Sequence, residues 1–226
     1  MLITGIKSRP VYDRLQPLPG GIRHIIAGQG SGGRAMLRLL DEMEGLDRPV
    51  TLLYAQESFS GQDYLAQLQQ HPGHPLRVYA SNQALIDDLN DLLGDATMGT
   101  RLYLAGSESF LGSAMQVATR FDLNRDEVLR EHSGTLVRRV WCVHCDTYTE
   151  NVTQRIYDCP GCNLTLVVRD HYSRRLAAFQ AVKADAEVPG ELLHSDDWLS
   201  DDDKSSHKKI MPCVSRAKCN RLVIDL

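Results

Sequence analysis

The chain has 226 residues, of which 42% are hydrophobic, and 25 basic against 29 acidic side chains give a formal charge of -4. This hydrophobic content can fill a core, which excludes a disordered protein, and the charge balance provides no general basic field for nucleic acid. No apolar run approaches about 18 residues, and Lys7 and Pro10 interrupt the stretch where a signal peptide would be continuously apolar. We therefore expect a soluble cytoplasmic protein with neither a membrane nor a nucleic-acid partner.

Up to about residue 135 the sequence alternates β-rich runs with amphipathic helices. Strands are predicted at 22–27, 50–54, 76–80 and 101–106. Helices are predicted at 33–44, at 62–70, from a cap at Ser81 or Asn82 to Gly94, and at 109–120. Strands that are separated by helices need crossover connections, so we predict an α/β fold with a parallel sheet and helices on both faces.

The character of the sequence changes near residue 136. Short β-type segments with four cysteines follow, and the remainder is acidic and serine-rich, a composition that cannot bury enough surface to offset chain entropy. We expect an α/β domain at 1–136, a small four-cysteine metal module at 137–183 and a flexible acidic tail at 184–226.

Four cysteines form the pattern C-x2-C-x13-C-x2-C, with Cys142 and Cys145 in "CVHC" and Cys159 and Cys162 in "CPGC". Two such pairs can form two knuckles that complete a tetrahedral shell of four thiolates around one metal ion. Each knuckle needs a residue that tolerates a positive φ after its second cysteine, and Asp146 and Asn163 stand there. A redox dithiol and unrelated buried cysteines are the metal-free alternatives.

The spacing alone does not choose the metal. Zinc would make the site a structural or docking element, whereas a single iron would make it a one-electron carrier, and we favour zinc because the surroundings typical of rubredoxin are only partly present. A complete four-thiolate shell leaves His144 no coordination position, so we expect a surface residue there. Cys213 and Cys219 lie outside the ligand set and are interpreted as free thiols.

Three glycines, Gly28, Gly30 and Gly33, match the G-x-G-x-x-G pattern between a predicted strand and a predicted helix. Such a loop can bind the pyrophosphate of a dinucleotide at the helix N-terminus, and Glu57 is an approximate candidate for the acidic residue that would contact a ribose. A glycine-rich turn without a ligand is the equally weighted alternative.

The segments "HIIAGQGSGGRAMLRLL", "RPVTLLYAQES" and "RLYLAGSESFLGSAM" resemble the nicotinamide-binding half of the ferredoxin-reductase family, especially the phthalate-dioxygenase-type oxygenase reductases, over about residues 20–135. The resemblance implies a nucleotide-binding fold. Where that family has a Cys-Gly-Pro-type turn near the reacting ring, this chain has Ala105, Gly106 and Ser107. We expect the flavin-binding barrel to be absent from this chain, and the loop to bind NAD(P)H weakly or not at all.

The whole arrangement resembles the small, rubredoxin-like subunit of bacterial dimethylamine monooxygenase. The resemblance extends over residues 1–190 and includes "MLITGIKSRPVYDRLQPLP", "RRVWCVHCDTYTE" and "CPGCNLTLVVRDHYSRRLAAFQAV". It implies NAD(P)H- and O2-dependent demethylation of dimethylamine to methylamine and formaldehyde. It also implies that FMN, iron–sulfur and haem chemistry lies in partner subunits.

A cationic cluster, a Glu-His-Ser run and a tryptophan are further features of the sequence. Arg169, His171, Arg174 and Arg175 form a cationic cluster that is interpreted either as a solvated face or as a docking patch beside the second knuckle. Neighbouring Glu131, His132 and Ser133 lack a nucleophile-elbow pattern, so we assign them no hydrolase role. Trp141 is expected to pack on the small core of the metal module.

Three functions remain open from the sequence. The first is an accessory or electron-transfer subunit of a multicomponent amine monooxygenase, not catalytic alone. The second is a free-standing NAD(P)H oxidoreductase component, which the lack of a flavin acceptor disfavours. The third is a zinc-stabilised protein-binding module without redox activity.

Overall fold

Five parallel strands form the first sheet in the computed structural model, which describes residues 11–71, 73–124, 126–135, 137–184, 192–193, 200–202 and 216–217. The strands are β1 (Arg23–Gln29), β2 (Val50–Ala55), β3 (Leu76–Tyr79), β4 (Thr100–Gly106) and β5 (Val128–His132). Their order is β3-β2-β1-β4-β5, and every neighbouring pair is parallel. The strand order therefore reverses beside β1, which is where open α/β sheets bind ligands at their carboxyl edge.

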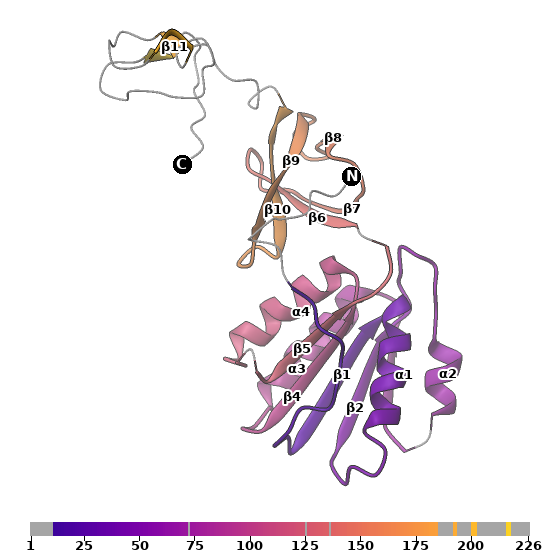
Figure 1. Ribbon diagram of the computed structural model, residues 1–226. Helices are drawn as coiled ribbons and strands as arrows, with labels where there is room; N and C mark the ends of the chain where they lie inside the picture. Colours follow the sequence, from indigo (N-terminus) through magenta and orange to yellow (C-terminus); the bar gives the residue numbers. More distant parts are fainter. Residues whose placement is uncertain are drawn as a thin grey trace.

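Helices cover both faces of this sheet (Figure 1). A 3-10 turn η1 (Gly30–Gly32) leads into α1 (Gly33–Glu42), which lies with α2 (Leu65–Gln70) on one face, while α3 (Asn82–Gly94) and α4 (Glu108–Arg120) lie on the other. Alternation along β1 supplies both cores, because Ile25 and Ala27 pack with α3 and α4 whereas Ile26 packs with α1. The predicted parallel sheet with helices on both faces is confirmed.

The local sequence explains where the helices begin. The Ser81 hydroxyl accepts a hydrogen bond from the Ala84 N–H at the start of α3, as the cap prediction requires, and Ser107 does the same for α4. Helix α2 begins later than the predicted 62–70, because the N–H of Tyr64 donates to the Tyr54 hydroxyl at 2.9 Å. The residues before Leu65 therefore belong to a loop fixed on β2.

Strand β5 is absent from the sequence-based predictions. Its residues, Val128–His132, include Arg130 and Glu131, and they do not show a continuous apolar run. The strand lies at the sheet edge, where the N-terminal segment runs alongside: the Asp13 N–H donates to the Arg130 carbonyl, and the Leu15 N–H donates to the Glu131 carboxylate. An edge strand that is covered by a polar contact needs fewer apolar residues than a central one.

The second sheet carries the four cysteines and has its own core. Its strands are β6 (Arg138–Cys142), β7 (Tyr148–Val152), β8 (Ile156–Asp158), β9 (Thr165–Ser173) and β10 (Ala178–Lys183), in the order β7-β6-β10-β9-β8. The buried cluster contains Val140, Cys142, Leu166 and Phe179. The expectation for Trp141 was wrong, because alternation along β6 turns Val140 and Cys142 toward this cluster and leaves Trp141 half-buried on the other face.

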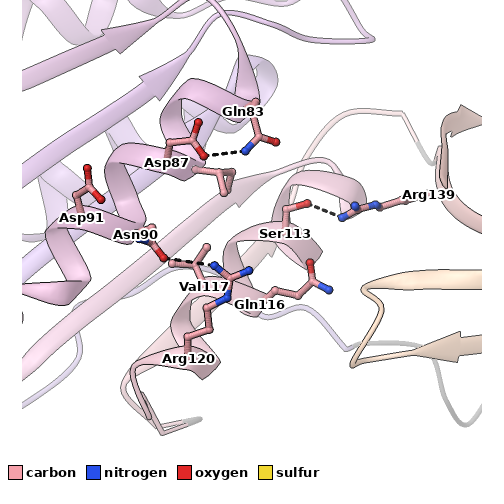
Figure 2. A pocket seen from close by; sticks show the side chains of 10 residues that line it. Gln83, Asp87, Asn90, Asp91, Ser113, Gln116, Val117, Arg120 and Arg139 are labelled. Atoms are coloured by element: carbon pink, nitrogen blue, oxygen red, sulfur yellow. Dashed lines mark hydrogen bonds between the residues drawn. The ribbon is translucent and has the colours of Figure 1, made fainter. Parts of the chain in front are cut away.

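The second sheet docks onto α4 through contacts that we call the seam, formed by Gly112, Ser113 and Gln116 of α4 with Arg139, Tyr172, Arg175 and Ala177 of the second sheet unit. Arg139 donates from Nη1 to the Ser113 hydroxyl at 2.7 Å, and the Gln116 amide donates to the Arg175 carbonyl at 2.8 Å. Figure 2 shows the polar groove of about 380 Å³ beside the seam, between α3, α4 and Arg139.

The seam leaves no room for a side chain at Gly112. A Cβ at this position would lie 2.9 Å from both the Ala177 Cβ and the Tyr172 hydroxyl oxygen. Near the same end of α4, the buried Glu108 accepts a hydrogen bond from the Tyr12 hydroxyl at 3.1 Å. Burial raises the pKa of Tyr172 to about 12, and the charge of Glu108 acts in the same direction. The seam therefore combines tight packing with hydrogen bonds between its two sides.

Beyond residue 184 the structure describes only short pieces of the chain, including β11 (Leu192–Leu193) paired antiparallel with β12 (Arg216–Ala217). Most of the predicted flexible tail, with Cys213 and Cys219, lies outside the described residues. Among the residues that are described, no helix is long and apolar enough to cross a membrane.

Candidate metal centre

Two tight turns with matching backbone geometry present the four cysteines. In the first, the Asp146 N–H donates to the Cys142 carbonyl at 3.0 Å, and in the second the Asn163 N–H donates to the Cys159 carbonyl at 2.8 Å. Asp146 and Asn163 have φ values of 59° and 56°. The predicted left-handed residue after each second cysteine is therefore confirmed, and the two turns are related by a local pseudo-symmetry.

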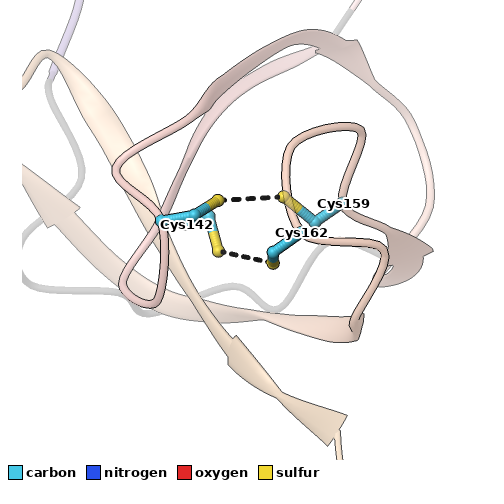
Figure 3. A group of neighbouring side chains, drawn as sticks. Cys142, Cys159 and Cys162 are labelled. Atoms are coloured by element: carbon cyan, nitrogen blue, oxygen red, sulfur yellow. Dashed lines mark hydrogen bonds between the residues drawn. The ribbon is translucent and has the colours of Figure 1, made fainter.

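The four sulfur atoms converge on one point between the turns (Figure 3), and all lie within 4.8 Å of one another. Cys142 Sγ lies 3.8 Å from Cys162 Sγ, and Cys145 Sγ lies 3.6 Å from Cys159 Sγ. A tetrahedron with metal–sulfur bonds of about 2.3 Å has edges of about 3.8 Å. The spacing thus fits a metal ion held by four thiolates, and zinc and iron fit it equally well.

The sulfur environment favours thiolates over thiols at part of the site. Burial raises the pKa of the Cys142 thiol to about 12, whereas hydrogen bonds from the side chain and the N–H of Thr147 lower the pKa of Cys145 to about 6. Backbone N–H groups of His144 and Cys145 also bond to the sulfur of Cys142. Such donors compensate part of the negative charge that four thiolates would bring to a bound cation.

His144 lies in the first turn with its ring exposed, and its Nε2 accepts a hydrogen bond from the Lys183 N–H at 3.2 Å. This contact ties the first turn to the end of β10, in keeping with a surface residue that is not a ligand.

The cationic residues do not gather beside the second turn as predicted. Arg169 and His171 lie along β9, whereas Arg174 and Arg175 follow that strand, which is nine residues long and begins near the second turn. The strand thus carries the last two arginines to the seam, away from the cysteines. The sequence cluster is extended in space because consecutive strand residues rise by about 3.3 Å each.

The glycine loop lies at the carboxyl end of β1, but its own chain packs against the glycines. A Cβ on Gly30 would lie 2.3 Å from Ser58 Cβ, one on Gly28 would lie 2.2 Å from the sulfur of Met36, and one on Gly33 would lie 2.5 Å from Tyr64 Cβ. Gly30 also has a φ of 47°, which glycine adopts readily. The missing side chains therefore make room for protein atoms at each of the three positions.

A hydrogen-bonded tyrosine fixes the segment that covers this loop. The Tyr54 hydroxyl lies 2.9 Å from the Gly30 carbonyl oxygen and 2.9 Å from Asp63 Oδ1, and it accepts from the Tyr64 N–H. Glu57, the candidate ribose ligand, instead accepts a hydrogen bond at 2.7 Å from the N–H of Asn82, where α3 begins. The Gly30 loop and the Glu57 carboxylate, which could contact a nucleotide, are thus both hydrogen-bonded within the protein.

A cavity of about 260 Å³ remains beside the loop, where Ser31, Arg34, Tyr64, His132 and Ser133 contribute to its lining. Glu131 also borders it. Its carboxylate accepts from the Leu15 N–H and pairs with Arg38. The Glu131, His132 and Ser133 side chains follow one another at the end of β5, and the sequence assigned them no hydrolase role.

At position 106, where reductases have their Cys-Gly-Pro-type turn, Gly106 leads directly into α4. The Ser107 N–H donates to the side-chain oxygen of Gln29, which comes from the end of β1. The last residue of β1 therefore bonds to the start of α4 across the point at which the strand order reverses, and this contact could not be foreseen from the glycine pattern.

Two family models match the chain. The model described as the N-terminal domain of dimethylamine monooxygenase subunit DmmA-like proteins matches residues 4–128, and the model for their C-terminal domain matches residues 139–182. The first match alone covers more than half of the chain and includes β1 to β4, and the second includes the four cysteines.

Individual relatives come from N-demethylating and monooxygenase systems. The delta subunit of a heme-dependent oxidative N-demethylase from Ectopseudomonas mendocina is 38% identical over 101 residues, which are 45% of this chain and 58% of that subunit. The carnitine monooxygenase reductase subunit of Acinetobacter baumannii is 26% identical over 222 residues, covering 91% of this chain and 66% of that protein. This chain therefore spans less than two thirds of either relative.

The crystal structure of an intact type IV self-sufficient cytochrome P450 monooxygenase matches with 20% identity and a TM-score of 0.43, over 90% of this chain and 27% of that one.

Proposed function

This chain belongs to the DmmA-like family of dimethylamine monooxygenase subunits, and we propose that it is an accessory or electron-transfer subunit of a multicomponent monooxygenase that demethylates a small amine. The reaction would consume NAD(P)H and O2 and convert dimethylamine to methylamine and formaldehyde. FMN, iron–sulfur and haem groups would reside in its partner subunits, and this chain would contribute no catalytic residue of its own. The subunit names of the relatives support such partners.

The observation that carries the proposal is the cluster of four cysteine sulfurs, all within 4.8 Å of one another. Cys142, Cys145, Cys159 and Cys162 would hold one metal ion, and we propose zinc, with a single iron as the second candidate. When bound, zinc would supply a redox-silent cross-link between the two turns, whereas iron would accept and return one electron. Cys145 and Cys162 are partly exposed and would bring the ion close to the surface. A single iron could exchange an electron with a partner protein there, which supports iron as the second candidate.

The α/β part would serve assembly in this proposal. The packing of Ser58 and Tyr64 against the glycine loop supports a sheet that keeps the nucleotide-binding architecture without a working pyrophosphate site. We extend the proposal to the organisation of the chain: residues 1–136 form the α/β domain, 137–183 the metal module and 184–226 the tail.

A second function, a zinc-stabilised protein-binding module without a redox role, is favoured by the same tetrahedral spacing if zinc is the resident ion. In that case partners would recognise the fold of the module and not its metal chemistry. The two functions differ in whether turnover depends on a redox-active ion in this chain.

The test combines metal identity with reconstitution. Elemental analysis and the optical spectrum of the purified chain decide the ion, because an iron tetrathiolate is coloured and zinc is not. Dimethylamine-dependent NAD(P)H oxidation is then measured with the partner subunits alone, with this chain added, and with its Cys159→Ser variant added. We expect turnover only with the unmodified chain. Full turnover from the partner subunits without this chain would overturn the proposal and leave the binding module.

A further inference from the structure

The two cysteine turns are alike in their backbone but differ in their side chains. Counting from the first cysteine, Thr147 of the first turn corresponds to Leu164 of the second, and His144 corresponds to Gly161. The backbone bonds match as well: the Cys142 N–H donates to the Thr147 carbonyl at 3.0 Å, and the Cys159 N–H donates to the Leu164 carbonyl at 2.9 Å. Cys145 and Cys162 are the second cysteines of the two turns, and we call their sulfur atoms the outer sulfurs. Any difference between these two sulfurs must therefore come from side chains.

The Thr147 hydroxyl supplies such a difference. Its Oγ1 lies 3.2 Å from Cys145 Sγ, within hydrogen-bonding distance for sulfur. The corresponding cysteine, Cys162, has Leu164 in the equivalent position, and a leucine side chain contains no hydrogen-bond donor. Both outer sulfurs accept a backbone N–H, from Thr147 and from Leu164 respectively. Cys145 therefore has one more hydrogen-bond donor available than Cys162.

Gly161 provides the space for this hydroxyl. A Cβ on Gly161 would lie 2.1 Å from Thr147 Oγ1 and 3.0 Å from Cys145 Sγ. Its φ is outside the left-handed region, so the backbone conformation does not itself require glycine. Glycine is thus needed at position 161 because any larger residue would collide with the Thr147 hydroxyl of the first turn.

We propose that Thr147 is a positioning residue of the metal centre, which donates a hydrogen bond to the Cys145 thiolate and makes the two outer thiolates chemically unequal, and that Gly161 keeps this hydroxyl in place. The inference rests on the proposed metal site, but it concerns the reactivity of single sulfurs and not turnover. A hydrogen bond that stabilises thiolate charge lowers the nucleophilicity of that sulfur. Cys162 then reacts faster with electrophiles than Cys145 does.

The experiment compares the two sulfurs within one molecule. The full-length, zinc-loaded chain is treated with a small amount of iodoacetamide, and peptide mass spectrometry measures how fast Cys145 and Cys162 are alkylated. Cys162 serves as the internal control for Cys145, so differences in protein concentration or zinc content cancel. Hydrogen bonds to charged groups are strong enough for the hydroxyl to change the ratio of the two rates about tenfold.

Five variants separate the hydrogen bond from a general loosening of the turn. Thr147→Val keeps the shape and removes the donor, so the Cys162-to-Cys145 ratio should fall about tenfold, whereas Thr147→Ser should keep the ratio of the unmodified chain. Gly161→Ala should lower the ratio as Thr147→Val does, because its methyl group displaces the hydroxyl. In the Thr147→Ala background, Gly161→Ala should then produce no further change.

The outcomes are decisive in both directions. An unchanged ratio in Thr147→Val, or additive effects of the two alanine substitutions, would overturn the proposal. If Thr147→Val loses zinc, the comparison of Gly161→Ala with Thr147→Ser, which retain the hydroxyl group, still decides it. Loss of zinc from the unmodified chain would instead refute the proposed metal site, so the two failures are distinguishable.

Discussion

Two helix glycines provide a matched test of the seam, because they differ in the space around a new methyl group. Gly112 of α4 would place a Cβ 2.9 Å from Ala177 Cβ, whereas Gly94 of α3 would place one no closer than 3.8 Å to Phe121. Replacing glycine by alanine in a helix stabilises a protein by about 0.5–1 kcal/mol through chain entropy. Overpacking of a filled site costs about 1–3 kcal/mol.

These magnitudes predict opposite signs for the same substitution. Gly94→Ala should raise the free energy of unfolding by about 0.5 kcal/mol, since Gly94 is the last residue of its helix. Gly112→Ala should lower it by about 1 kcal/mol, because the cost of overpacking exceeds the gain in helix propensity. Urea denaturation of the metal-loaded chain, followed by circular dichroism at a helix wavelength, measures both. Equal stabilisation by the two alanines would refute the close packing at the seam.

A compensating substitution extends the test. Ala177 has a φ of 49°, an uncommon value for alanine, and its Cβ is one of the atoms that a methyl group on Gly112 would meet. Ala177→Gly removes that atom and relieves the backbone strain. The Gly112→Ala, Ala177→Gly double variant should therefore recover most of the lost stability, which the same denaturation experiment checks.

Three further results are expected. Cys159→Ser should lose the metal and unfold the second sheet while the helical circular dichroism signal persists, since all four α-helices named above belong to the first sheet; retained stoichiometric metal would contradict this. Burial lowers the pKa of His24, so the unfolded chain takes up the proton first and the free energy of unfolding should fall as the pH drops from 7 toward 5. A His24→Phe variant that keeps the same pH dependence would contradict that assignment. Calorimetric titration with NADH and NADPH should give weak or no binding, and a dissociation constant in the low micromolar range, about -8 kcal/mol, would show a working glycine loop.

The sequence predicted the parts of the fold in which one local signal decides the structure. The positive φ values of Asp146 and Asn163 and the cap at Ser81 depend on single residues with strong preferences, and they were foreseen. The family resemblance, read from the glycine loop and the cysteine turns, is confirmed by the family matches.

Features that depend on tertiary contacts were not foreseen. β5 was missed because its pairing with β4 and the N-terminal segment leaves little trace in an apolar pattern, and Trp141 was assigned to the wrong face because its position depends on the register of β6. The roles of Glu57 and Thr147 are of the same kind. Glu57 accepts a hydrogen bond from Asn82, which lies 25 residues further along the chain, and the Thr147 hydroxyl depends on the space that Gly161 leaves in the other turn.

The length of β9 also sets a scale for the assembly. Nine strand residues at about 3.3 Å each make a rod of roughly 30 Å, with the second cysteine turn near one end and the seam at the other. The strand therefore acts as a spacer, which keeps the second cysteine turn roughly 30 Å away from the end of the strand that packs on α4.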